Sequence, residues 1–590
     1  MPFSCRRIII TAAGSIMTAL MLLLPLKFGG LAVMPEVGGF YPEALFDWLF
    51  ISYPPHLTGV IGSVIMVLLL LTVKTIPRKL QIFCISWGIL PLLAALPGMI
   101  YGMPDDTLGE LTNLAGIGVC IASGTLLIAE DKCWGKRFAA AFCCGGLWCA
   151  VTGIHQYFSG LDELREFAAE QARSGIILSD AMKLKLTDPR IFSTMASSNA
   201  LASLLLMLTP LTLFFAFKWG SFFEPVKISR LLFVLVFTGI TVTAMVMTSS
   251  RSTLFCPVAA IIPALLSNDK FSLRIRMILL GLAAVIISGG IFFAIHFGRG
   301  TTSMLERADY LRSSALLTVK YPLTGSGWGG FFRTHMTVKL SGTDESARDP
   351  HNVVAAFASQ AGVIPGIIML AVLLLPLIWL WKERFSPGFP MAVFWSGVLF
   401  SLHSLLDCDW HVPALPIAMG ILYAAAINET GDDNVSTFNL RQLTAIRISL
   451  ACLTVAAFAG NYRYLQGDFA LARLQEKLYP GSAMQRTAAA HLSVPLLIKQ
   501  LRALRPDSQT SWQLEGDWLL RCGAPDAAEK CYRKAAELDP RRPGIWAKLA
   551  RLQMHSGKQD EAVKLMQKAH ELFPKNPRYD VKKFTSGELP

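Results

Sequence analysis

The stretch MASSNALASLLLMLTPLTLFFAF, residues 195–217, is 23 residues long and contains no Asp, Glu, Lys or Arg. A helix needs about 20 mainly apolar residues to cross the hydrocarbon core of a bilayer, so this stretch predicts a membrane-spanning helix. Similar stretches recur and predict about thirteen spans, near 8–26, 57–73, 80–100, 112–129, 138–158, 195–217, 231–248, 252–267, 277–297, 352–381, 389–406, 412–428 and 446–461. The sequence therefore predicts an all-α fold that begins with a polytopic transmembrane helical domain over residues 1–465.

The composition of the whole chain is typical of a membrane protein, since 53% of its 590 residues are hydrophobic and only 16% are charged. Residues 8–26 follow Arg6 and Arg7, as the core of a signal peptide would. No small-residue cleavage site follows them, so we expect them to form the first span. The formal net charge of +13 comes mostly from loops between spans and from the tail, without a nucleic-acid-binding motif. We therefore expect no nucleic-acid partner.

Lys and Arg are concentrated in alternate loops, and this bias predicts the orientation of the chain, because loops rich in these residues stay in the cytoplasm. With a cytoplasmic N-terminus, the outer loops 101–111 and 407–411 contain no Lys or Arg. Two longer segments, 159–194 and 298–350, then lie outside the cytoplasm. An odd number of spans places the tail outside as well, whereas a miscounted span would move it back inside.

The tail, residues 466–590, contains a 34-residue repeat. The same residue type recurs at this offset in the pairs Trp512 and Trp546, Gly523 and Gly557, Asp526 and Asp560, Ala528 and Ala562, Ala535 and Ala569, Leu538 and Leu572, and Pro540 and Pro574. This period is typical of tetratricopeptide helix pairs, in which small residues let two helices approach closely. The repeats predict an α-solenoid, with 470–506 as a degenerate third unit. Its role is left open between a protein-binding surface and a cap on the membrane domain.

The twelve Cys show no metal-binding spacing and lie mostly inside predicted spans, where they act as small apolar packing residues. Cys522 and Cys531 lie on the paired helices of the tail. We expect two buried thiols there, with a disulfide as the alternative.

Four arginines fall on the side of the membrane where the charge rule disfavours them, beside a histidine. They are Arg190, Arg251, Arg307 and Arg312, and the histidine is His351. Their contexts are DPRIFSTMASSNALASLLL (188–206), TSSRSTLF (248–255), ERADYLRSSALLTVKYPLTGSGWGGFF (306–332) and DPHNVVAAFASQAGVIPGIIML (349–370).

In their order and membrane side, these segments resemble the O-antigen ligase and polymerase superfamily of bacterial membrane glycosyltransferases. The resemblance covers about 188–370 and includes an Arg before a span, a Ser-Arg turn, an Arg…Pro…Gly-x-Gly segment and a His-Asn pair at the start of a span. One departure is Tyr310 or Leu311 where family members often have Trp, which affects only local packing. The resemblance implies a multi-pass protein of the bacterial cytoplasmic membrane that acts without a metal or cofactor.

The residue chemistry is consistent with that activity. An enzyme that takes a glycan from a polyprenyl diphosphate must neutralise the departing diphosphate, and a planar guanidinium matches two phosphate oxygens at once. The acceptor hydroxyl needs a base, and an imidazole with a pKa of about 6.5 is suited to this. We therefore assign diphosphate binding to the four arginines and catalysis to His351. The acceptor is left open among a lipid, another glycan and a protein.

Each assignment has an alternative. An Arg at a helix end is often an interfacial anchor, and a His at a helix start is often a cap. Asp407 and Asp409 have the spacing of a DxD metal site, which would make the enzyme metal-dependent. A transporter or flippase of lipid-linked sugars would need the same arginines, and a scaffold would act through its repeats. Five other histidines, His155, His296, His335, His403 and His411, are expected to be structural, the glycines of 325–330 to form a turn, and 159–187 to form an amphipathic helix over the site.

Overall fold

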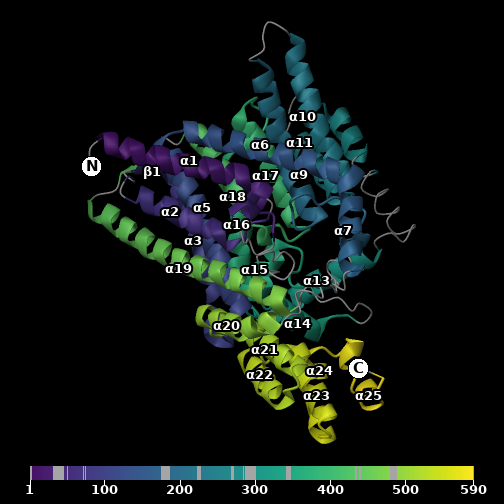
Figure 1. Cartoon of the computed structure of the whole chain (residues 1–590). Helices are drawn as coiled ribbons and strands as arrows, with labels where there is room; N and C mark the ends of the chain where they lie inside the picture. Colours follow the sequence, from purple (N-terminus) through teal and green to yellow (C-terminus); the bar gives the residue numbers. More distant parts are fainter. Residues whose placement is uncertain are drawn as a thin grey trace.

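The structure is a computed structural model of the chain. It describes residues 3–30, 45–49, 51–70, 72, 75–173, 186–221, 227–266, 272–282, 285, 301–340, 347–431, 435–437, 440–478 and 488–588. These residues are almost entirely helical, as expected for an all-α fold (Figure 1). The strands in the described part are three residues each, β1 (Thr75–Pro77) and β2 (Val435–Thr437), and they pair antiparallel.

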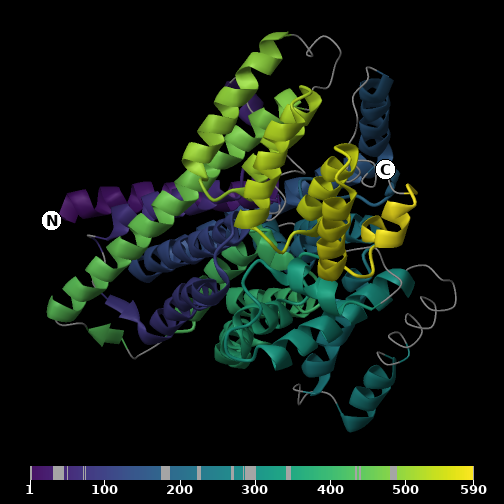
Figure 2. The same cartoon turned by 90° about the horizontal axis from the view of Figure 1, so that it is seen from below.

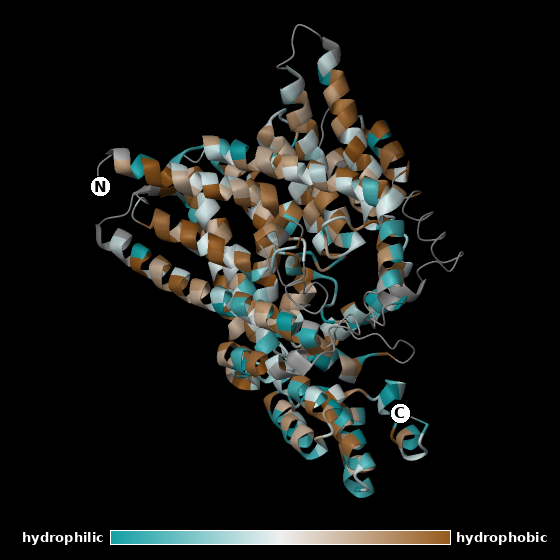
Figure 3. Cartoon of the chain, viewed as in Figure 1, coloured by the Kyte–Doolittle hydropathy of each residue, from teal (hydrophilic) through white to brown (hydrophobic). Residues whose placement is uncertain are grey.

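Six helical segments are long and apolar enough to cross a membrane. They contain α1 (Phe3–Lys27), α3 with α4 (Arg78–Ala95, Gly98–Tyr101), α5 (Asp105–Glu130), α6 continued by η3 and α7 (Cys133–His155, Gln156–Gly160, Leu161–Arg173), α9 (Ser198–Gly220) and α10 (Lys227–Met247). Shorter apolar helices are α2 (His56–Leu69), α11 (Ser252–Leu266), α16 (Val363–Trp379), α17 (Phe389–Ser404) and α18 (Ala414–Glu429). In Figure 3 the hydrophobic colour follows these helices, consistent with a membrane protein.

For two of the thirteen expected spans, the described residues do not show a complete, separate helix. Most of 277–297 lies outside the described residues. Residues 446–461 lie within α19 (Leu440–Leu478), a single helix of 39 residues. The total of thirteen spans therefore stays a prediction.

The expected span 352–381 is not one helix. It divides at Gly362 into α15 (Val353–Ala361) and α16, and Gly362 has a φ of +108°. The turn after Tyr321 packs against this break, because Val363 N–H donates to the Pro322 carbonyl at 2.8 Å. A Cβ on Gly362 would lie 2.5 Å from the Leu323 carbonyl oxygen, so this approach requires glycine. The sequence prediction was wrong here because hydropathy alone does not detect a break inside an apolar stretch.

Segments predicted on the same side of the membrane contact one another. On the predicted inner side, Arg6 pairs with Glu130, Lys136 pairs with Glu429, and β1 pairs with β2. On the predicted outer side, the Tyr101 hydroxyl lies 3.2 Å from that of Thr324. These contacts join loops that the prediction assigns to one side, and the side that faces the cytoplasm stays a prediction.

The centre of the predicted membrane domain is built on α5 and α18. Nearly every residue of α18 is buried, as expected for a helix that is apolar on all sides. Glycines allow the two helices to lie close, since a Cβ on Gly420 would be 2.6 Å from the Ile121 side chain. Helix α5 carries Asp105, Asp106 and Glu110 at its N-terminal end, which the loop charges predict to lie outside.

The tail forms the predicted helix pairs. They are α21 (Gln509–Arg521) with α22 (Pro525–Leu538) and α23 (Pro543–His555) with α24 (Gln559–Leu572), followed by α25 (Val581–Thr585). Gly523 and Gly557 have φ values of +75° and +76°, which explains glycine at both turns. The third unit consists of the end of α19 packed on α20 (Ala488–Leu504), while 479–487 lie outside the described residues.

Two details of the tail differ from expectation. The proposed boundary at 465 lies inside α19, so one continuous helix joins the membrane domain to the first repeat unit. Cys531 is a buried thiol as expected, but Cys522 is exposed, because it lies at the C-terminal end of α21 rather than between helices. Both cysteines are free.

Figure 2 shows the repeats against the face that carries 322–340.

Candidate functional site

Asp407, in the loop between α17 and α18, is the centre of the candidate site. Its Oδ1 lies 3.0 Å from Nδ1 of His351. Its Oδ2 accepts hydrogen bonds from Arg307 at 3.0 Å and from the Asn199 amide at 2.6 Å. Arg307 also donates to the Leu406 carbonyl at 2.7 Å. The fold thus brings together three segments of the predicted site that are far apart in the sequence.

His351 is held by its backbone as well as by its ring. Its φ of +56° lies in the left-handed region, and its N–H donates to Asp349 at 2.8 Å. The cap of α15 is Asn352, whose side chain accepts from Ala355 N–H. The alternative in which His351 caps this helix is therefore wrong. The imidazole, 29% exposed, is left for another role.

The contact with Asp407 sets the proton position on His351. When Nδ1–H donates to the carboxylate, the lone pair of the neutral ring is on Nε2. Burial lowers the pKa of His351, but the hydrogen bond that the ring donates to Asp407 and the charges of Asp407 and Asp349 outweigh burial, so its pKa is raised. Burial would raise the pKa of Asp407, yet His351 and Arg307 hold it well below its usual range. In this pair, Asp407 is a charged carboxylate, and His351 is a stronger base than a free imidazole.

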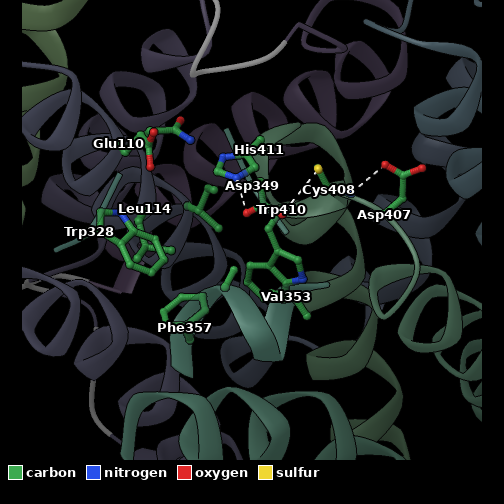
Figure 4. A pocket seen from close by; sticks show the side chains of 13 residues that line it. Glu110, Leu114, Trp328, Asp349, Val353, Phe357, Asp407, Cys408, Trp410 and His411 are labelled. Carbon is green, nitrogen blue, oxygen red and sulfur yellow. Dashed lines mark hydrogen bonds and ion pairs between the residues drawn. The ribbon is translucent and has the colours of Figure 1, made fainter. Parts of the chain in front are cut away.

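A second carboxylate–imidazole pair lies beside the first. Nε2 of His411 lies 2.9 Å from Oδ2 of Asp349, and the Cys408 thiol lies 3.4 Å from Asp349 and 3.3 Å from Nδ1 of His351. Burial, together with the charges of Asp349 and Asp407, raises the pKa of Cys408 well above its usual value, so the thiol stays protonated. Figure 4 shows Cys408 between the two carboxylates, in a pocket that is also lined by Glu110 and three aromatic side chains, Trp328, Phe357 and Trp410.

The four arginines do not all lie at this centre. Arg307 binds Asp407 directly. Arg190 donates two hydrogen bonds from its guanidinium to the Asp188 carboxylate, at 2.7 Å and 2.9 Å. The negative charge of Asp407 also helps to raise the pKa of Arg190. Arg251 is exposed in the turn before α11, next to Ser250, whose hydroxyl donates to Asn199 at 3.0 Å. Arg312 instead bonds to Asp309 and to the Val338 carbonyl, within the outer segment.

Tyr310, which the sequence suggested only for packing, contacts the site. Its ring stacks on His351 with centroids 5.6 Å apart, and His335 also packs edge-on against it at 5.3 Å. Of the other histidines, His403 bonds to Asp409 and His155 lies near Ser159. His296 lies outside the described residues.

The two residues of the DxD motif have separate partners. Asp409 accepts from Ser203, His403 and Ser404 inside the helical core, whereas Asp407 faces His351. Within the described residues, the one group with metal-ligand donors in reach of each other is His351, Asp407 and Cys408, within 4.8 Å. Arg307 places a positive charge on the same carboxylate, which disfavours a second cation there. The arrangement suits acid–base chemistry better than metal binding.

Sequence reasoning missed Asp407 as the partner of His351 and Asn199 as its amide donor. The available signal was an acidic residue in an outer loop that lacks Lys and Arg, on the same side as His351. Sequence spacing could not pair them, because 55 residues, which include α15, α16 and α17, lie between positions 351 and 407.

Comparison with known proteins bears on the tail alone. A tetratricopeptide repeat family model matches residues 519–581, which contain α22, α23 and α24. A search of curated proteins finds no match to the chain. The C-terminal region therefore contains tetratricopeptide repeats.

Proposed function

We propose that this protein transfers a glycan from a polyprenyl-diphosphate carrier to a hydroxyl acceptor at the outer face of the cytoplasmic membrane. In this reaction the oxygen of the acceptor forms a bond to the anomeric carbon, the bond to the diphosphate breaks, and the acceptor loses its proton. His351 takes that proton at Nε2, with Asp407 orienting the ring. Arg190, Arg251 and Arg307 bind the diphosphate, and no metal is required.

The main observation that supports this proposal is the contact between Asp407 and His351, together with the hydrogen bond that Arg307 donates to the second carboxylate oxygen of Asp407. A carboxylate that fixes the tautomer of an imidazole is a recurring arrangement for a general base. A cationic residue next to it suits a leaving group that carries negative charge. Arg312, which bonds within its own segment, is assigned to the structure of that segment rather than to the diphosphate.

The test is transfer in liposomes that contain the purified protein, a lipid-linked glycan and an acceptor. We expect the donor to be consumed and a new glycosidic product to form, with full activity in the presence of EDTA. A flippase would move the lipid without forming a product. A scaffold would do neither, and a metal-dependent transferase would lose activity in EDTA and recover it with magnesium or manganese.

Arg190→Lys is expected to lower the transfer rate about 30-fold, although it keeps the charge. Lysine cannot reproduce a bidentate contact with two phosphate oxygens, and the loss of about 2 kcal/mol of charge-assisted hydrogen bonding corresponds to this factor. Arg165→Lys is a matched control, because Arg165 has the same 40% exposure and also pairs with a nearby aspartate. Equal activity of both variants would favour an interfacial anchor over a diphosphate ligand.

Transfer is expected to increase with pH through the raised pKa of His351, so its midpoint should lie above the ordinary value of 6.5. A base must be deprotonated to act, and Asp407 and Asp349 stabilise the protonated ring while Arg307 opposes them. The measurement is the initial transfer rate from pH 5 to pH 9. A rate that stays flat over this range would contradict a titrating base at position 351.

A further inference from the structure

The repeat domain is joined to the outer face of the membrane domain by a cluster of four buried or half-buried charges. Arg333 donates to Asp539 of the repeats at 2.6 Å and to Asp106 of α5 at 2.7 Å. Arg542 of the repeats donates to the same two carboxylates, at 3.0 Å and 3.2 Å. The side chains of Arg333 and Asp539 are 0% and 1% exposed.

Such a cluster specifies one docked position of the repeats. Each arginine bridges two carboxylates, and each carboxylate accepts from two arginines, so a shift of the repeats would leave buried charges without partners. A further contact reinforces it on the same face, where Arg505, which also bonds to Asp468 within the first repeat unit, lies 3.8 Å from Asp105 of α5. The repeats are therefore a fixed part of the outer surface.

Arg333 also begins a short path of contacts to His351. It belongs to α14 (Phe331–Val338), and His335 lies two residues later on that helix. His335 is fully buried and packs edge-on against Tyr310, and Tyr310 stacks on the ring of His351 at 5.6 Å with an angle of 17° between the planes. Tyr310 is itself buried, so the ring of His351 rests on a surface whose position depends on α14.

We propose that the repeat domain positions the imidazole of His351: Asp539 and Arg542 fix Arg333, Arg333 fixes α14, and α14 fixes Tyr310 against the ring. Arg333 and Asp539 are positioning residues in this arrangement, because neither contacts the reacting atoms. The part of this inference that concerns activity rests on the function proposed above.

The experiment compares Asp539→Asn with Asp517→Asn in the full-length protein. Asp517 is a matched control, because its carboxylate pairs with Tyr532 and Lys548 inside the repeats. Asp539→Asn is expected to lower kcat about 10²-fold, the effect of a displacement of about 1 Å in a catalytic group, with donor binding unchanged. Asp517→Asn should leave kcat unchanged.

Two readouts do not depend on glycan transfer. Asp539→Asn should accelerate amide exchange across 305–338, and should change the rate and midpoint of deuterium exchange at the ring carbon of His351, both read by mass spectrometry. Arg542→Gln, at a residue that is 21% exposed, should produce the same changes more weakly if Asp539→Asn does not fold. In a Tyr310→Leu background, Asp539→Asn should have little further effect on the ring of His351, because the path is already broken.

Unchanged exchange at His351 and in 305–338 in folded Asp539→Asn and Arg542→Gln proteins would overturn the inference. A wild-type protein that forms no glycosidic product, but whose His351 exchange responds to Asp539→Asn, would instead overturn the proposed function and leave the positioning role in place.

Discussion

His351→Asn is expected to lower glycan transfer by about 10²- to 10⁴-fold, the usual contribution of a general base. Asparagine is the appropriate replacement because the backbone at this position has a φ of +56°, a conformation that asparagine tolerates better than most residues. The N-cap of α15 is retained, since it comes from Asn352. The variant therefore removes proton transfer while keeping the local fold.

The measurement is the transfer rate together with binding of the lipid donor, which should persist because the arginines are intact. His155→Asn serves as the control, because His155 is exposed and lies near Ser159 rather than at the site. If the His351→Asn variant transferred glycan at the wild-type rate, the catalytic assignment of His351 would be wrong, and Asp407 would be a purely structural residue.

Asp407→Asn is expected to lower transfer by about 10³- to 10⁴-fold, the effect seen when an amide replaces the carboxylate that orients a catalytic imidazole. The carboxylate accepts from His351 on one oxygen and from Arg307 and Asn199 on the other. An amide has only one oxygen that accepts, so its NH₂ must face one of these donors. Either the tautomer of His351 is then no longer fixed, or the hydrogen bond from Arg307 is lost. The unsatisfied group should also cost about 1–3 kcal/mol of unfolding free energy.

Asp409→Asn provides the comparison for this variant, because Asp409 is also buried, two residues away, but bonds to Ser203 and His403 instead. It should destabilise the protein while folded molecules keep their activity. The residual transfer by Asp407→Asn should also have a pH midpoint below that of the wild type, since the main charge that raises the pKa of His351 is gone. Equal activity of the two variants would separate Asp407 from the reaction.

Local patterns in the sequence were sufficient for much of the fold. The 34-residue repeat predicted α21–α24, because each of these helix pairs depends on residues a few positions apart. Hydropathy located the apolar helices for the same reason. It did not locate the break at Gly362, because that break depends on a carbonyl from the distant segment 322–323.

For the candidate site, the sequence singled out residue types and a side of the membrane. It placed Arg307 and His351 in one group on the basis of chemistry, and the structure brings these two together. It also grouped Arg312 with them, and Arg312 bonds to Asp309 and Val338 instead. Loop charge predicts on which side of the membrane a helix end lies. It does not predict which neighbouring residue a side chain at that end contacts.

The sequence by itself determined that the chain is all-α, where its apolar helices lie and that its tail is built of repeats, because these properties follow from composition and from periodicities within one or two turns. Only the tertiary structure decided that Asp407 is the partner of His351 and that Arg333 and Asp539 join the repeats to the outer segment. These contacts form between residues 56 and 206 positions apart. Their existence depends on how whole helices pack, and no local pattern encodes that packing.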